Sequence, residues 1–306
     1  MTYVRRTDWD GLPRATREAV EARTGPVRSA VTVSAGRNSA LAAVLATENG
    51  RIFVKGLRLV DPGLATQSRE AAVAPYVRAV SPRLLWRIQT RGWDVLGLEH
   101  VEGRHADYTP GSVDLVAVSD VMGRLGRLVC PDLPQLKRAE LRWQDYFDDP
   151  RDATCLAGRA LLHTDWDPLN VLIADDRALL VDWAWPTLGA AWVDPACLVQ
   201  HLVVAGHDAK SAENLARQVP AWHTATPAQL DAFAAAKARL WDEIATTDPQ
   251  PAKIQMREAS RAWAEYRLGR PLAEPSTVSN LVDHCGSRNM SDRSRHGAQR
   301  RPTLGT

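Results

Sequence analysis

Residues 161–185 read LLHTDWDPLNVLIADDRALLVDWAW, and this stretch organises the interpretation of the whole chain. His163, Asp165 and Asn170 fit the spacing H-x-D-x-x-x-x-N, and Asp182 follows further along the same stretch. The chain is poor in histidine and asparagine, so random placement would rarely produce this pattern. The alternative interpretation is a buried histidine and aspartate in an ordinary hairpin, and His163 is expected to support the loop in either case.

Two short apolar runs, 171–173 and 179–181, flank the polar residues 174–178. Apolar, β-prone runs around a polar loop of this length predict a β-hairpin. Pairing Val171 with Val181 centres that hairpin on Asp176. The same register sets the residues just outside the paired runs opposite each other, with their Cα atoms about 5 Å apart.

Those two residues are Asn170 and Asp182, an amide and a carboxylate. Oxygen ligands of this kind suit Mg²⁺, which usually keeps several waters and takes further ligands from substrate phosphates. Asp165 lies on the loop just before the hairpin, close enough to accept a proton from a hydroxyl group facing that metal. The stretch therefore predicts a magnesium site formed by Asn170 and Asp182, with Asp165 as the general base.

These residues match the catalytic loop and metal-binding aspartate of the kinase signature. The finer pattern resembles the aminoglycoside phosphotransferase and choline kinase family, where the loop commonly reads H-G-D-x-H-P-x-N and the metal aspartate precedes a tryptophan, as Asp182 precedes Trp183 here. Two positions depart from that pattern, because Thr164 replaces the glycine and Asp167 replaces the histidine. Protein kinases of the Ser/Thr type carry a lysine at the position of Asp167, so the acidic residue argues against a protein kinase.

The resemblance implies a nucleotide-binding sheet before the catalytic stretch. Residues 28–57 have the pattern of three strands, and residues 52–55 (IFVK) resemble the V-A-I-K strand whose lysine contacts the α- and β-phosphates. This assigns Lys55 to the nucleotide, although a lysine on an edge strand is more often a solvated gatekeeper. The loop 34–39 lacks G-x-G-x-x-G, so backbone N–H groups and the hydroxyls of Ser34 and Ser39 are expected to hold phosphate.

Glu70 is the expected partner of Lys55. In a helical stretch over about 66–80, Glu70 shares a stripe with three valines, which predicts a buried carboxylate that needs a counter-charge. In kinases the corresponding pair orients the lysine toward the nucleotide. Pro75 should kink or split this helix, and a surface glutamate is the alternative.

Two further apolar runs, 83–89 and 93–101, complete a five-stranded antiparallel sheet. The resemblance then implies that 99–103 is the hinge between two lobes, where backbone groups at Glu99 and Val101 bind adenine. The expected fold is α+β and bilobal, like a protein kinase. Its parts are an N-lobe over 1–101, a mostly helical C-lobe over 102–270, and a disordered tail over 271–306.

The helices of the C-lobe are marked by local signals. Asp194-Pro195 has the pattern of a helix start, and Asp194 is expected to be structural. Residues 226–229 (TPAQ) form a capping box that opens a helix whose apolar stripe Lys237 interrupts. A last helix is expected to end at Gly269.

Composition is that of an ordinary globular protein, with 45% apolar and 24% charged residues among 306. No run of about 18 apolar residues suggests a membrane span, and the N-terminus has no apolar core of a secretory leader. The four scattered cysteines predict neither a disulfide framework nor a zinc site. These features favour a reducing, cytoplasmic location.

The net charge of +2 is dominated by the C-terminal tail. Residues 284–306 hold five arginines and one aspartate, a balance of +4, which leaves −2 for residues 1–283. A polar tail of this composition is expected to be solvated and disordered. Nucleic-acid binding through the tail is the weaker alternative.

The sequence thus predicts an ATP- and Mg²⁺-dependent phosphotransferase that acts on a hydroxyl group of a small molecule. The acidic body and Asp167 favour a cationic acceptor such as an aminoglycoside, but solvated surface acids explain the charge equally well. Choline, a sugar or another metabolite remains open as the acceptor. A catalytically silent pseudokinase and a nucleic-acid-binding regulator are the alternatives from other classes, and the pattern does not address the oligomeric state.

Overall fold

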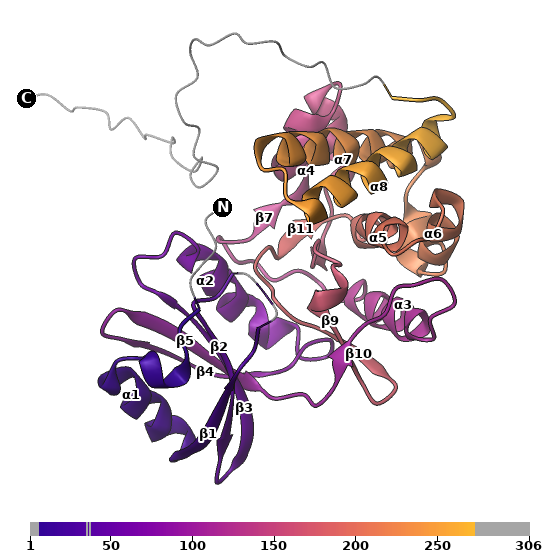
Figure 1. The fold of residues 1–306 in the computed structure, drawn as a ribbon. Coiled ribbons are helices and arrows are strands. Elements are labelled where there is room, and N and C mark those ends of the chain that lie inside the picture. Colours follow the sequence, from indigo (N-terminus) through magenta and orange to yellow (C-terminus); the bar gives the residue numbers. More distant parts are fainter. Residues whose placement is uncertain (1–5, 35, 37, 273–306) are drawn as a thin grey trace, which may run out of the picture. The chain divides into compact units, whose positions relative to one another are not determined.

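The computed structural model describes residues 6–34, 36 and 38–272. Residues 273–306, which hold the basic tail, Cys285 and most of the segment 271–306 expected to be disordered, lie outside the described residues. Within residues 1–273 the chain forms a sheet-containing lobe followed by a mostly helical lobe (Figure 1). The expected bilobal α+β fold is confirmed.

The N-terminal lobe is a five-stranded antiparallel sheet in the order β1-β2-β3-β5-β4, as expected. Hairpin turns connect β2 to β3 at Asn49-Gly50 and β4 to β5 at Arg91-Gly92, and each glycine has a positive φ that these tight turns require. Helix α1 (Arg14–Thr24) packs beside β4. The strands are β1 (Val27–Thr32), β2 (Leu41–Thr47), β3 (Gly50–Arg58), β4 (Leu84–Thr90) and β5 (Trp93–Glu99).

Helix α2 (Leu64–Val73) carries Glu70 and lies against β3. The helix ends at Val73, two residues before Pro75, and a 3₁₀ turn, Ala74–Tyr76, continues the chain. Proline has no N–H to donate and its ring clashes with the preceding turn, so the α-helix cannot continue. The predicted split of the 66–80 stretch is therefore confirmed.

The C-terminal lobe is built from six helices in the part of the chain that is described. Thr226 forms the predicted capping box with Gln229, and Gly269, at φ 64°, ends the last helix. None of the helices in the described ranges has a stretch both long and apolar enough to cross a bilayer. The helices are α3 (Asp114–Leu125), α4 (Ala139–Trp143), α5 (Val193–Val204), α6 (Ala209–Ala216), α7 (Pro227–Thr247) and α8 (Pro251–Leu268).

The predicted hairpin is present as β9 (Val171–Ala174) and β10 (Arg177–Leu180), but its register is shifted by one residue. Val171 pairs with Leu180, not with Val181, and the turn contains only two residues. Asp175 adopts φ 51° there, and the left-handed conformation that aspartate tolerates makes the tighter turn possible. As a result Asn170 lies opposite Val181, whose N–H donates to the Asn170 carbonyl at 2.9 Å, and the predicted pairing of Asn170 with Asp182 is wrong.

Two small three-stranded sheets contain the short strands that follow the N-terminal lobe. β6 (Arg104–His105) adds a third strand to the hairpin beside β9. Gly103, just before it, passes so close to Ile173 that a Cβ atom would lie 2.4 Å from the Ile173 carbonyl oxygen. A second small sheet contains β7 (Lys137–Arg138), β11 (Thr187–Gly189) and β8 (Ala160–Leu162).

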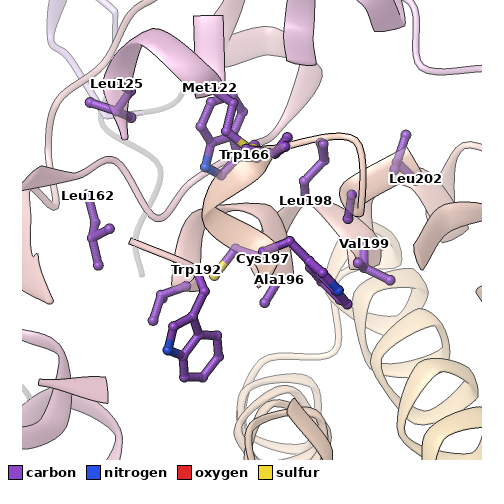
Figure 2. Close-up of a cluster of buried hydrophobic side chains, with 14 of the residues drawn as sticks. Met122, Leu125, Leu162, Trp166, Trp192, Ala196, Cys197, Leu198, Val199 and Leu202 are labelled. Carbon is purple, nitrogen blue, oxygen red and sulfur yellow. The ribbon is translucent and has the colours of Figure 1, made fainter. Parts of the chain in front are cut away.

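The two lobes have separate hydrophobic clusters. The smaller one, with Leu41 and Val95 at its centre, lies under the five-stranded sheet. The larger one fills the helical lobe, and Figure 2 shows Trp166 of the loop before β9 within it, together with Met122 of α3 and Leu198 of α5. Burying Trp166 at this point fixes the loop that carries Asp165 to the core of the helical lobe.

Candidate active site

Lys55 connects the sheet, helix α2 and the segment after the hairpin. Its Nζ forms an ion pair with the Glu70 carboxylate and lies 3.1 Å from Asp182 Oδ1. Both carboxylates lower the energy of the buried ammonium group, and this outweighs burial, so the pKa of Lys55 is raised. The structure thus contains the expected Lys55–Glu70 pair and adds Asp182 to it.

Asp182 remains an anion in this environment. Burial alone would raise its pKa, but the positive charge of Lys55 and hydrogen bonds from Lys55 and Asn38 bring the pKa below its usual value. Asp182 also has a positive φ of 62°, which is unusual for a residue with a side chain. An ionised carboxylate is a hard oxygen donor that suits Mg²⁺, and the side-chain oxygen of Asn170 is the second donor that the sequence predicts.

The catalytic loop is fixed by His163 and Asp194. The His163 ring accepts a hydrogen bond at Nδ1 from the Asp165 N–H (3.3 Å), so its Nε2 carries the proton and donates to the Val181 carbonyl (3.0 Å). The buried Asp194 carboxylate accepts hydrogen bonds from the N–H groups of His163 (3.0 Å) and Thr164 (2.8 Å). Both residues therefore position the loop, as the sequence predicts.

Thr164 explains why a glycine is usual at its position. Its φ is 68°, a left-handed conformation that is costly for a β-branched residue, on the order of 1–3 kcal/mol. Three hydrogen bonds hold it there. Its N–H donates to Asp194, its Oγ1 accepts from Arg142 Nη1 at 2.7 Å, and its hydroxyl donates to the Trp185 carbonyl at 3.3 Å. Strain at this position is thus balanced by polar contacts to both sides of the loop.

Asp165 follows Thr164 and is half-buried. Burial raises the pKa of Asp165, the charge of His201 opposes this, and the nearby carboxylates of Asp182 and Asp167 raise it further. The Asn170 amide donates to the Asp165 carbonyl oxygen at 3.3 Å, so the loop's two polar residues are joined directly. A carboxylate with a raised pKa is a stronger proton acceptor than an ordinary aspartate once it is ionised.

Asp167, whose role the sequence left open, has a local structural contact. Its side chain accepts a hydrogen bond from the Leu169 N–H at 2.9 Å and caps the 3₁₀ turn Pro168–Asn170. Aspartate before proline is a common way to start such a turn. The turn positions Asn170, so this acid needs no cationic acceptor to explain it.

The other nucleotide residues predicted from the sequence lie at the two ends of the sheet lobe. In the loop 34–39, positions 35 and 37 are outside the described residues, while Ser39 and Gly36 accept hydrogen bonds at their carbonyls from Arg6. Ser34 lies just after Val33, whose N–H donates to Ala42. At the other end Glu99 closes β5 and its carboxylate pairs with Arg83, and Val101 follows in the segment between the lobes.

A row of cations and indole rings extends away from Thr164, and sequence reasoning missed it. The Arg142 guanidinium lies 5.3 Å from the Trp185 ring and 4.8 Å from the Trp143 ring. The Arg69 guanidinium of α2 lies 5.0 Å from the same Trp185 ring, and Lys237 Nζ of α7 lies 5.4 Å from the Trp143 ring. We call the set Arg69, Trp185, Arg142, Trp143, Lys237 and Trp241 the cation–tryptophan row; Trp241 lies 5.9 Å from Lys237 Nζ.

Lys237 is the most unusual member of this row. Its side chain belongs to a residue only 6% exposed, and within the described residues it has neither an ion pair nor a hydrogen bond. A cation–π contact contributes about 0.5–2 kcal/mol, whereas burying an ion costs several kcal/mol. The two indole rings therefore do not offset the burial of this charge. The one sequence signal was its interruption of the apolar stripe of α7.

Proteins similar to this chain were found only among solved structures. No family model and no curated protein sequence matched the chain. Among solved structures, choline kinase LicA from Streptococcus pneumoniae has a TM-score of 0.56 at 13% identity, with 82% of this chain and 98% of that chain covered.

Two further structures show the same similarity. Aminoglycoside phosphotransferase APH(4)-Ia, solved as a thermostable mutant with ADP and hygromycin B, has a TM-score of 0.54 at 16% identity, covering 81% of this chain and 98% of that one. A phosphotransferase-like protein from Ralstonia eutropha has a TM-score of 0.56 at 15% identity, covering 84% and 99%. The chain therefore has the fold of small-molecule kinases, and the resemblance read from residues 161–185 is confirmed at the level of the fold.

Proposed function

We propose that the protein transfers the γ-phosphate of ATP to a hydroxyl group of a small molecule. The observation that carries this is the contact of Lys55 with both Glu70 and Asp182, because it joins three residues far apart in the sequence in the order that a kinase site requires. The nucleotide complexes among structures of the same fold support ATP as the donor.

The reaction divides among the residues as follows. Lys55 holds the α- and β-phosphates, and Glu70 orients its amine. Asp165 aligns the acceptor hydroxyl and takes its proton, and the acceptor oxygen forms a bond to the γ-phosphorus. The bond from that phosphorus to the β–γ bridging oxygen breaks at the same time, which releases ADP. Positioning and charge neutralisation do most of the work in such reactions.

Asn170 and Asp182 would hold Mg²⁺. When bound there, the ion supplies charge neutralisation for the phosphate oxygens and completes its ligands with those oxygens and water. The low pKa of Asp182 keeps its carboxylate available as a ligand across the neutral range. Backbone groups at Glu99 and Val101 are proposed to bind adenine, and the loop with Ser34 and Ser39 to cover the phosphates.

The rival function is a pseudokinase that binds nucleotide without transfer. Against it, the predicted base Asp165 is present, and Lys55 contacts both Glu70 and Asp182. A screen of hydroxylated metabolites and antibiotics for an ATP-dependent mass gain of one phosphate tests the proposal, with Asp165→Asn as the matched control. Nucleotide binding without phosphorylation or ATP hydrolysis across the panel would favour the pseudokinase.

A further inference from the structure

The cation–tryptophan row differs from the other buried cations of the protein. Lys55 is neutralised by two carboxylates, and Arg267, also buried, pairs with Glu213 at 2.8 Å and Asp231 at 2.7 Å. The three cations of the row have no carboxylate partner among the described residues. They therefore form a positively charged patch without ion pairs, in which the negative charge of Asp165 acts on both Arg142 and Lys237 and raises their pKa against the effect of burial.

Each cation of the row is held in place by direct contacts to neutral groups. Arg142 donates to the hydroxyls of Thr164 (2.7 Å) and Thr187 (3.1 Å), and Arg69 donates to the Ala184 carbonyl (3.1 Å). Lys237 contacts only aromatic faces, and burial lowers its pKa. Groups fixed in this way are prepared to bind an anion, because they lose little freedom when it arrives.

The row begins beside the proposed base. Arg142 contacts Thr164, and Thr164 immediately precedes Asp165. The cation assigned to the nucleotide phosphates, Lys55, comes from the sheet lobe and has its own carboxylate partners, Glu70 and Asp182. Arg142 and Lys237 come from α4 and α7 of the helical lobe. An anion bound by these two residues would thus belong to the acceptor.

We infer that the acceptor is a hydroxylated small molecule carrying an anionic oxygen group, a carboxylate or a phosphate or sulfate ester, which Arg142 and Lys237 bind. This rests on the proposed function and replaces the cationic acceptor favoured by the sequence. Guanidinium and ammonium donors suit such groups, the guanidinium through paired N–H donors and the ammonium as a point charge. The indole rings beside them would keep water away and strengthen the interaction.

The first experiment detects the anion site without turnover. Sulfate is the probe, added at constant ionic strength, and thermal unfolding is the readout. Lys55→Met combined with Glu70→Gln serves as the background, because it removes the cation of the nucleotide site together with the carboxylate that would be left buried without a counter-charge. We expect a saturable rise in melting temperature in this background, its loss when Lys237→Met is added, and its retention with Lys237→Arg.

The unfolding temperature of Lys237→Met without sulfate is a second readout. Without sulfate, Lys237→Met should unfold at a higher temperature than the wild type, because it removes a buried charge that has neither an ion pair nor a hydrogen bond among the described residues. A sulfate response of equal size with and without Lys237, or no response beyond that of chloride, would overturn the inference. A response that depends on Lys55 alone would do so too, because it would assign the anion to the nucleotide site.

The second experiment uses the phosphorylation screen with acceptors that share a pyranose ring and differ in charge, such as glucuronate, glucose and glucosamine. Anionic acceptors should have the highest kcat/KM, and Lys237→Met should raise their KM about 10- to 100-fold with little change in kcat. A preference for cationic or neutral acceptors would refute the inference. If no compound is phosphorylated, the proposed function fails, while the sulfate result still decides whether the anion site exists.

Discussion

Lys55 Nζ lies 3.1 Å from Asp182 Oδ1, although the two residues are 127 positions apart in the sequence. Lys55 comes from the central region of the sheet and Asp182 from the segment after the β9–β10 hairpin. Their contact makes the sheet lobe and the helical lobe parts of one site. The predictions below test what each member of that site does.

Lys55→Ala should slow phosphate transfer or weaken ATP binding by more than tenfold, because it removes the cation that faces the phosphates. It also leaves Glu70 buried without a counter-charge. Glu70→Gln should have a smaller effect, since it removes the orienting charge and leaves the ammonium paired with Asp182. Measurement of KM for ATP and of kcat in both variants checks this. Unchanged ATP kinetics in both would mean that the nucleotide binds elsewhere.

Asp182→Asn should nearly abolish turnover, because it removes the charge that would neutralise the metal and phosphates. Asn170→Ala should be milder, since it removes a neutral ligand and one hydrogen bond to the Asp165 carbonyl. Activity measured against Mg²⁺ concentration distinguishes the two, and more Mg²⁺ should partly rescue Asn170→Ala. Wild-type Mg²⁺-dependent activity in Asp182→Asn would contradict the assignment.

Asp165→Asn should bind MgATP with similar affinity but transfer phosphate about 10²- to 10⁴-fold more slowly, the usual range for loss of a general base. The matched control is Asp167→Asn, which keeps Asp165 and weakens only the cap of the turn Pro168–Asn170. Calorimetry for nucleotide binding and steady-state kinetics give the two readouts. If Asp167→Asn were inactive and Asp165→Asn active, the base would be the wrong carboxylate.

Activity should fall at low pH as Asp165 becomes protonated. Because its pKa is raised in the folded protein, the acid limb of kcat/KM should lie above the ordinary value of an aspartate, about 3.9. Asp167→Asn removes a negative charge that raises this pKa, so the limb should move to lower pH. A pH–rate profile of the wild type and Asp167→Asn checks the sign, and a shift to higher pH would be evidence against Asp165 as the titrating group.

Thr164→Ala and Thr164→Gly separate backbone strain from the side-chain contact. Both lose the hydrogen bond from Arg142, but only glycine relieves the left-handed backbone, a difference of about 1–2 kcal/mol. We therefore expect Thr164→Gly to be more stable than Thr164→Ala by about 1 kcal/mol in urea unfolding. Equal stability of the two variants would show that the backbone at this position carries no strain.

Local patterns in the sequence were sufficient for the elements and for most of the site. The five strands, the capping box at Thr226 and the end of α2 before Pro75 follow from alternation, side-chain capping and the geometry of proline, which act over a few residues. The motif from His163 to Asp182 indicated the fold because its spacing combines a loop and a hairpin. The pairing of Lys55 with Glu70 could be proposed because a buried carboxylate needs a counter-charge.

The tertiary structure alone decided what depends on contacts between distant segments or on a single turn. The hairpin register changed because a left-handed Asp175 allows a two-residue turn, and apolar periodicity does not report that choice. The second contact of Lys55, to Asp182, required the two lobes to meet. The cation–tryptophan row is assembled from α2, α4, α7 and the segment after the hairpin, and no spacing along the chain encodes that four such segments converge. Sequence thus indicated the proposed catalytic chemistry, because that depends on residue types at short spacings, whereas only tertiary packing decided which charges surround the proposed site.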